Sequence, residues 1–174
     1  MALTLLQLRA KPGARSHGVL LAGRLAIPVV IGRAGIRANK REGDGATPRG
    51  RFRLRRLWWR PDRSPKPLTL LPARRIDRVV AWCENARDRR YNRAFRRLAN
   101  ETGDRLWRDD HLYDVIIEID HNTRPRVAGR GSAVFLHIAR PDRSPTAGCI
   151  AFAAHDLRRL LPRLGPDTSI LIQV

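Results

Sequence analysis

Short apolar runs separated by glycine-bearing turns are the feature that most limits what this chain can fold into. Residues 3–9, 18–22 and 25–31 are such runs, and a turn at residues 22–24 separates the last two. Runs of this length between turn residues are typical of β-strands. Pro28 has no backbone N–H to give to a neighbouring strand, so we expect the third run to be an edge strand or an irregular one.

The rest of the chain adds further predicted strands and one helical segment. Leucines at positions 157, 160, 161 and 164 have helical spacing, which predicts a helix over residues 153–164. Residues 88–98 are expected to be partly helical and residues 101–110 a short helix or a loop. Further strands are expected at 51–54, 113–120, 133–138 and 169–174, with a loop at 58–72. These elements predict a mainly β single domain with one or two helices.

The formal net charge of +19 comes almost entirely from arginine, because lysine occurs only at positions 11, 40 and 66. A nucleic-acid-binding protein would have such a charge, and so would an enzyme that works on a polyanionic polymer. A genome biased towards GC-rich codons gives the same composition without functional meaning. The charge alone leaves these three interpretations open.

Nothing in the sequence predicts a membrane span or an export signal. No segment reaches the roughly 18 apolar residues that a transmembrane helix needs. The apolar run at residues 2–8 is too short for the apolar region of a secretory signal, and no basic segment precedes it.

The two cysteines, Cys83 and Cys149, could form a disulfide or act separately, and their number does not decide between these. Cys149 follows a proline-containing loop, residues 139–148, and this loop comes directly after a predicted strand that carries His137. The loop can bring the thiol beside the imidazole, which titrates in the range needed to remove the thiol proton. On residue types alone, a buried structural cysteine and a satisfied core histidine are the more common alternative. Cys83 has no histidine within twenty residues and is expected to be structural.

Two sequence motifs link Cys149 and His137 to a known type of catalytic domain. Thr146-Ala147-Gly148-Cys149 has the form Ser/Thr-x-Gly-Cys, and Thr47-Pro48-Arg49-Gly50-Arg51-Phe52 has the form Thr-Pro-x-Gly-x-Phe. In this order, after a histidine on a strand, they resemble the L,D-transpeptidase catalytic domain (YkuD-type). A branch of that family resembles the chain over nearly its whole length, through segments at 40–45, 82–83, 91–93, 107–110, 112–114 and 129–133.

The resemblance implies a role for each residue of this loop. Cys149 would be the nucleophile and His137 its base. Main-chain N–H groups around Gly148 and Cys149 would form an oxyanion hole, with Thr146 shaping the turn. Ser132, or the backbone near it, would orient the imidazole.

The implied fold is the mainly β L,D-transpeptidase fold, a β-sandwich or barrel-like domain over residues 1–174, with the cysteine loop at the rim of a sheet. Three positions depart from the family pattern, and one of them is Ile138, which stands where much of the family has Gly. Ala147 stands where many members have His and this branch often has an acidic residue. Ala151 stands where many members have Arg or Asn, a side chain thought to hold the substrate. Substrate contacts are therefore expected from Arg130, Arg140, Arg143 and Tyr113.

The implied reaction is acyl transfer on peptidoglycan stem peptides. The Cys149 thiolate would attack the amide between a diamino acid and the terminal D-alanine of a tetrapeptide stem, forming a thioester. An amine of a second stem would give a 3–3 cross-link, water would make the protein an L,D-carboxypeptidase, and a lipoprotein side chain would make it an anchoring enzyme. Carbapenem-type inhibitors are expected to acylate Cys149.

Alternatives from other classes stay open. Ala147 and Ala151 would suit a catalytically weak peptidoglycan-binding domain, whereas a basic nucleic-acid-binding module would leave both motifs unexplained. No cofactor is expected, and no metal, because His111, His121 and His155 lack partners at metal-ligand spacing. The substrate predicts a place in the bacterial cell envelope or periplasm, although no export signal is visible. The oligomeric state is not predicted.

Overall fold

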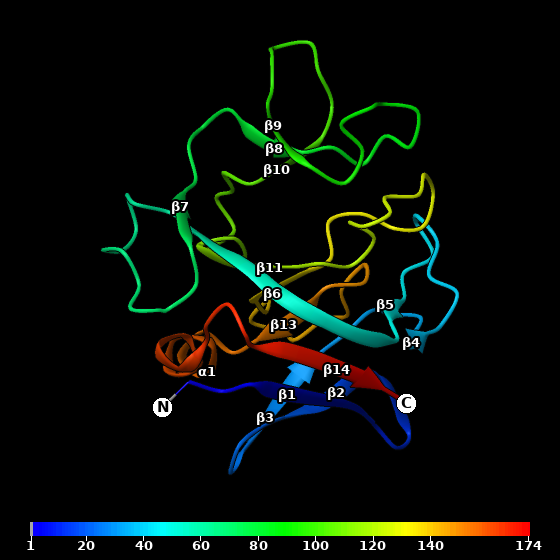
Figure 1. The fold of residues 1–174 in the computed structure, drawn as a ribbon, viewed down its shortest axis with the longest axis vertical. Coiled ribbons are helices and arrows are strands. Elements are labelled where there is room, and N and C mark those ends of the chain that lie inside the picture. Colours follow the sequence, from blue (N-terminus) through cyan, green and yellow to red (C-terminus); the bar gives the residue numbers. More distant parts are fainter. Residues whose placement is uncertain (1) are drawn as a thin grey trace.

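A nine-stranded sheet forms the body of the protein in the computed structural model, which describes residues 2–174 (Figure 1). Its strands, in spatial order, are β11 (Val115–Ile119), β12 (Phe135–Ile138), β13 (Ile150–Phe152), β3 (Leu25–Val30), β2 (Ala14–Ala22), β1 (Leu5–Lys11), β14 (Ser169–Gln173), β6 (Gly50–Trp59) and β7 (Ala73–Arg75). Because β11 also pairs with β6, the sheet closes on itself and leaves β7 attached outside. The expected mainly β, barrel-like fold is confirmed.

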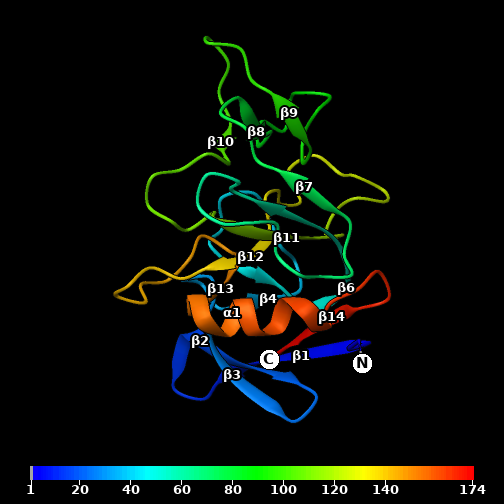
Figure 2. The same cartoon turned by 90° about the vertical axis from the view of Figure 1, so that its left-hand side faces the viewer.

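Smaller elements complete the domain. A three-stranded sheet contains β8 (Val80–Trp82), β9 (Ala94–Arg96) and β10 (Asp104–Arg105), and it lies at the end of the molecule opposite the two termini (Figures 1 and 2). Strands β4 (Ile36–Arg37) and β5 (Thr47–Pro48) form a short parallel pair. The helix α1 (Ala154–Leu160) continues into a 3-10 turn, η1 (Leu161–Arg163), as the leucine spacing predicted. No helix in residues 2–174 is long and apolar enough to cross a membrane.

Alternating burial explains why the apolar runs become strands of this sheet. In β1, Leu6 and Leu8 are fully buried while Arg9 is exposed, which is the period of two that a strand requires. Pro28 lies on β3, which is an interior strand rather than an edge. Strand β3 pairs with β13 only through Val29 and Val30, so the missing N–H of Pro28 falls outside that pairing.

Two clusters of buried side chains lie on the two sides of the β11–β12 region. The larger one fills the barrel and takes in Leu157 and Leu160 of α1. The smaller one lies between the barrel and the three-stranded sheet and is rich in aromatic rings. Since both faces are covered, every residue of β11 and β12 is buried. Cys149 belongs to the smaller cluster, so the thiol lies where the two sheets meet.

Two expectations about elements are wrong. Residues 88–98 form turns and strand β9 instead of a partial helix, because Asp88 accepts a hydrogen bond from the Arg90 backbone N–H at 2.7 Å and so makes a turn. Residues 101–110, expected as a short helix or a loop, are loop except for the short strand β10. The loop expected from residue 58 begins after Trp59, because Trp58 and Trp59 are buried and extend β6.

Candidate active site

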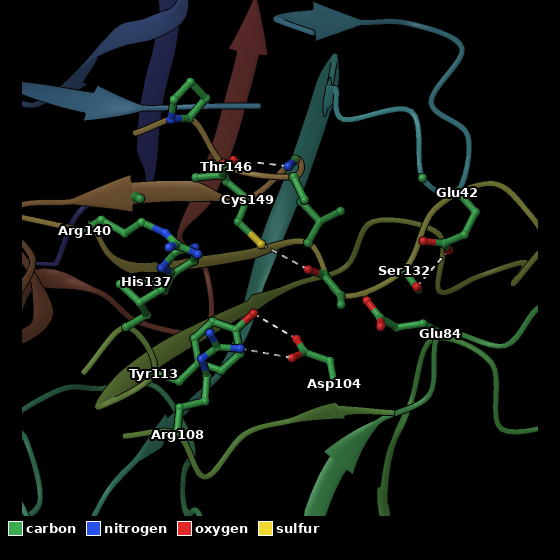
Figure 3. A pocket seen from close by; sticks show the side chains of 18 of the residues that line it. Glu42, Glu84, Asp104, Arg108, Tyr113, Ser132, His137, Arg140, Thr146 and Cys149 are labelled. Atoms are coloured by element: carbon green, nitrogen blue, oxygen red, sulfur yellow. Dashed lines mark hydrogen bonds and ion pairs between the residues drawn. The ribbon is translucent and has the colours of Figure 1, made fainter. Parts of the chain in front are cut away.

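A cavity of about 350 Å³ opens beside the Gly-Cys segment, and Figure 3 shows the side chains that line it. Its walls come from β12, from the loop before β13 and from segments of the small sheet. The residues predicted from the sequence that line it are Cys149, His137, Gly148, Thr146, Ser132, Arg140 and Tyr113.

Strand pairing brings the thiol and the imidazole together. Strands β12 and β13 are parallel, and His137 is level with Ala151. Cys149 precedes Ala151 by two residues, so its side chain points to the same face. The connection between the two strands is the loop that the sequence predicted, and it returns Cys149 to the level of Phe135, whose N–H contacts the sulfur at 3.4 Å. The two reactive groups therefore lie on one face of neighbouring strands (Figure 3).

The Cys149 thiol is protonated at rest. Its Sγ–H donates to the Ala133 carbonyl at 3.1 Å, and only 9% of the residue is exposed. Burial raises the pKa of Cys149 to about 12, and the nearby carboxylates of Asp104 and Glu84 add to this. A thiolate in this site must therefore form during the reaction rather than before it.

The His137 imidazole is neutral and oriented. Its Nδ1 lies 2.8 Å from the Ile138 carbonyl oxygen, which only accepts, so Nδ1 carries the hydrogen and Nε2 has a free lone pair. The edge of the ring packs against Tyr113, with ring centroids 5.4 Å apart. Burial lowers the pKa of His137 to about 4, and the charge of Arg108 lowers it further.

The turn before the cysteine is held by two threonines. The Thr146 hydroxyl donates to the Cys149 carbonyl at 2.7 Å and accepts from the Gly148 N–H at 3.1 Å. The Thr47 hydroxyl accepts from the Gly32 N–H and donates to the Gly148 carbonyl, both at 2.9 Å. Gly148 has a φ of 144°, and a Cβ there would meet the Ala46 carbonyl at 2.7 Å, so this position requires glycine.

Two groups with predicted roles have partners of their own in the structure. The Gly148 N–H, one of the predicted oxyanion donors, donates to the Thr146 hydroxyl at 3.1 Å. The Ser132 hydroxyl, predicted to orient the imidazole, donates to Glu42 at 2.8 Å, while His137 Nδ1 donates to the Ile138 carbonyl.

Two of the predicted substrate-binding arginines lie outside the lining of the cavity. Arg143 is exposed and donates to the Pro28 carbonyl at 3.3 Å, since its positive φ of 54° turns the loop towards β3. Arg130 is exposed in the loop after β11, where its carbonyl lies 3.1 Å from His121 Nε2.

Charged side chains that the sequence did not single out line the same cavity. Lys40 is 6% exposed, and its Nζ pairs with Asp44 Oδ1 at 2.6 Å. Its Cε lies 3.6 Å from where a Cβ on Gly148 would stand. The segment 40–45 is part of the resemblance, but no local pattern in the sequence marks Lys40 as a residue of the site.

Three carboxylates also line the cavity, and Figure 3 shows Glu42 and Glu84 on the side away from Arg140 and His137. Burial, together with the charges of Asp104 and Glu42, raises the pKa of Glu84 to about 7. Asp104 accepts from Tyr113 at 2.8 Å and lies 3.6 Å from Arg108 Nη1, and Arg108 also pairs with Asp110. Arg140 is therefore the arginine at the cavity that has no ion pair within the described residues, and Glu42 and Glu84 make the far side acidic.

Comparison with known proteins identifies one family. The model of the L,D-transpeptidase catalytic domain (YkuD) matches residues 15–172, nearly the whole chain. Neither the curated proteins nor the solved structures contain a match to this chain.

Thr47→Val tests whether the buried hydroxyl holds the cysteine turn. Valine keeps the shape but leaves the Gly32 N–H and the Gly148 carbonyl unpaired, so we expect a loss of about 2–4 kcal/mol in the free energy of unfolding. Thr47→Ser keeps the hydroxyl and should lose about 1 kcal/mol from the missing methyl group. Urea unfolding of the two variants measures the difference, and equal losses would show that the hydroxyl has no such role.

The pH dependence of stability tests the neutral imidazole. Between pH 6.5 and about 4 the unfolded chain binds a proton at His137 that the folded chain does not, so falling pH destabilises the fold. Relative to His137→Asn, we expect the wild type to lose about 2 kcal/mol between pH 7 and pH 5. The raised pKa of Glu84 acts in the opposite direction, so urea unfolding must compare the two proteins at each pH. A difference that does not change with pH would contradict a lowered pKa.

Proposed function

The chain belongs to the L,D-transpeptidase catalytic domain family, and from this we propose that it is a cysteine acyltransferase that remodels peptidoglycan stem peptides. One observation carries the proposal. A protonated thiol and a neutral imidazole with a free Nε2 lie on the same face of neighbouring strands in one cavity. This pair can exchange a proton during attack on a carbonyl carbon, which is the chemistry of acyl transfer.

The first half of the reaction forms a thioester. Cys149 Sγ attacks the carbonyl between the diamino acid and the terminal D-alanine of a tetrapeptide stem, while His137 Nε2 takes the thiol proton. The imidazolium then gives that proton to the departing amine of D-alanine as the C–N bond breaks. Both groups are neutral at rest, so their charges form only during the reaction. The site is buried, and electrostatic interactions between these charges and their neighbours are stronger there than in water.

Two groups are placed to stabilise the negative oxygen of that step. The Cys149 N–H belongs to the nucleophile itself and is our candidate for one donor. Lys40 is buried beside Gly148 and brings a positive charge to the same turn. Its pairing with Asp44 fixes the ammonium group in position.

The charge pattern of the cavity suits the two ends of the substrate. Arg140 lines the cavity near His137, and we assign it to the carboxylate of the D-alanine residue, the function that an Arg or Asn at the position of Ala151 would have in other members. Arg108 also lines the cavity, but it is held by Asp110 and Asp104. The carboxylates of Glu42, Glu84 and Asp104 would attract an ammonium group. This acidic side favours an amine as the acceptor, so we propose a 3–3 cross-link as the main product.

The second half of the reaction releases the enzyme. The acceptor ammonium group first loses a proton to solvent. The resulting amine attacks the thioester carbonyl, His137 takes a second proton from the nitrogen, and that proton returns to the Cys149 sulfur as the C–S bond breaks. Water in place of the amine would give L,D-carboxypeptidase activity. The family is typically associated with the cell envelope, and we propose that the protein acts there.

Turnover of purified disaccharide-tetrapeptides, followed by liquid chromatography and mass spectrometry, tests the proposal. We expect loss of D-alanine and formation of a tripeptide-linked dimer. Cys149→Ala should abolish both products, and His137→Asn should slow them by about 10²–10⁴-fold because the general base is gone. Cys83→Ala removes the other buried free cysteine and is the matched control, with activity expected to be retained.

Each alternative outcome identifies a different function. Tripeptide without dimer would make the protein a carboxypeptidase. Binding of stem peptides without any change in their mass, in wild type and Cys149→Ala alike, would contradict the proposed enzyme and leave a peptidoglycan-binding domain.

A further inference from the structure

A second cavity of about 460 Å³ shares no lining residue with the first one. It lies between strands β6 and β7 of the large sheet, strands β8 and β9 of the small sheet, and the loop at residues 123–126 (Figure 1). Half of its lining residues are arginines, namely Arg55, Arg56, Arg74, Arg93, Arg124 and Arg126, and Glu118 is the one carboxylate among them.

A β-bulge places two of these arginines side by side. The register between β6 and β11 passes from Arg56 opposite Glu118 to Leu54 opposite Ile119, so Arg55 is an extra residue. Both guanidinium groups therefore reach Glu118, Arg55 at 3.5 Å and Arg56 at 3.3 Å. Glu118 is buried and also accepts a hydrogen bond from Trp58 Nε1 at 3.1 Å. This single carboxylate already has three partners and carries only one negative charge for the six arginines.

The remaining four arginines lack a counter-charge. Within residues 2–174, Arg74, Arg93, Arg124 and Arg126 form no ion pair with a carboxylate. The Nε of Arg126 is buried and has no hydrogen-bond partner there. Burial, followed by the charges of Arg93 and Arg55, lowers the pKa of Arg126. Several positively charged guanidinium groups thus lie close together, and one buried N–H donor, Arg126 Nε, has no acceptor. A bound anion would reduce the repulsion between the guanidinium groups and accept a hydrogen bond from that donor.

The aromatic side chains that line the cavity strengthen the attraction between the arginines and a bound anion. The guanidinium carbons of Arg56 and Arg74 each lie 5.9 Å from the centre of the Trp58 ring. Trp58 and Trp82 are both buried and line the cavity, so part of its wall is aromatic. Charge–charge attraction is larger next to such a surface than in open solvent. Arginine forks also match the oxygens of a phosphoryl group, to which they donate two parallel hydrogen bonds.

We propose that this cavity is a binding site for a phosphoryl group, carried by a ligand with at least two clustered negative charges. A carboxylate carries one negative charge against the four guanidinium groups that lack a counter-charge, whereas a diphosphate presents several charged oxygens at once. The site is distinct from the cysteine cavity and does not depend on the proposed acyl transfer.

Binding of inorganic pyrophosphate, measured by isothermal titration calorimetry, tests the proposal with two charge-matched double variants. Arg93→Gln with Arg126→Gln removes two guanidinium groups from the cavity. Arg158→Gln with Arg159→Gln removes two exposed ones from α1 and changes the net charge equally. We expect the first pair to weaken binding at least about 10-fold and the second to change it by less than about 2-fold, because only the first pair contacts the ligand. Equal weakening in both, or no binding by the wild type, would overturn the site.

Further arms distinguish the sources of the phosphoryl group. Inorganic phosphate, polyphosphate and a short DNA duplex are titrated at the same ionic strength. If the double variant does not fold, the single variant Arg126→Gln replaces it in these titrations. Cavity-dependent binding of pyrophosphate or polyphosphate supports the proposal. Cavity-dependent binding of DNA without binding of pyrophosphate would overturn it in favour of a nucleic-acid site. The double variant Arg93→Gln with Arg126→Gln should turn over stem peptides as fast as the wild type. The phosphoryl site can therefore be disproved without affecting the acyltransferase proposal, and the reverse also holds.

Discussion

The parallel pairing of β12 with β13 is the interaction on which the candidate active site depends. It sets His137 level with Ala151, and therefore puts Cys149 on the same face as the imidazole. Parallel neighbours usually need a helix between them, but here a loop of eleven residues, 139–149, makes the crossover. A bridge between Gly32 and Thr146 holds this loop from one side, and the Thr47 hydroxyl holds it from another. The thiol is therefore fixed by the segment that follows β3, by β5 and by β12 together, not by its own loop.

Burial determines how this pair can work. An exposed cysteine and histidine would titrate near neutral pH, but burial moves the two pKa values apart, to about 12 for Cys149 and about 4 for His137. Neither group is charged until a substrate enters. The charged side chains stand around the pair, with Arg140 near the imidazole and Glu42 and Glu84 across the cavity. This division suits a substrate that has a carboxylate at one end and meets an amine at the other.

The sequence predicted the elements of the fold better than the surroundings of the site. Alternating burial and leucine spacing were sufficient for the mainly β domain and its C-terminal helix, because both signals are local. Residues 88–98 were mistaken because side-chain hydrogen bonds of Asp88 replaced helical ones. A motif predicts Cys149 and His137 as site residues, and both line one cavity in the folded chain. Lys40, Glu84 and Asp104 come from distant segments that only the folded chain brings together, and no local pattern marks them.

The central claim is that Cys149 is an accessible thiol which His137 activates for acyl transfer. Intact-protein mass spectrometry after incubation with a carbapenem tests it most directly, with Cys149→Ala and His137→Asn run beside the wild type. The account predicts one drug-sized mass increase on the wild type, none on Cys149→Ala, and a much slower increase on His137→Asn. Folded wild-type protein without an adduct, or an adduct that forms equally fast on His137→Asn, would contradict it.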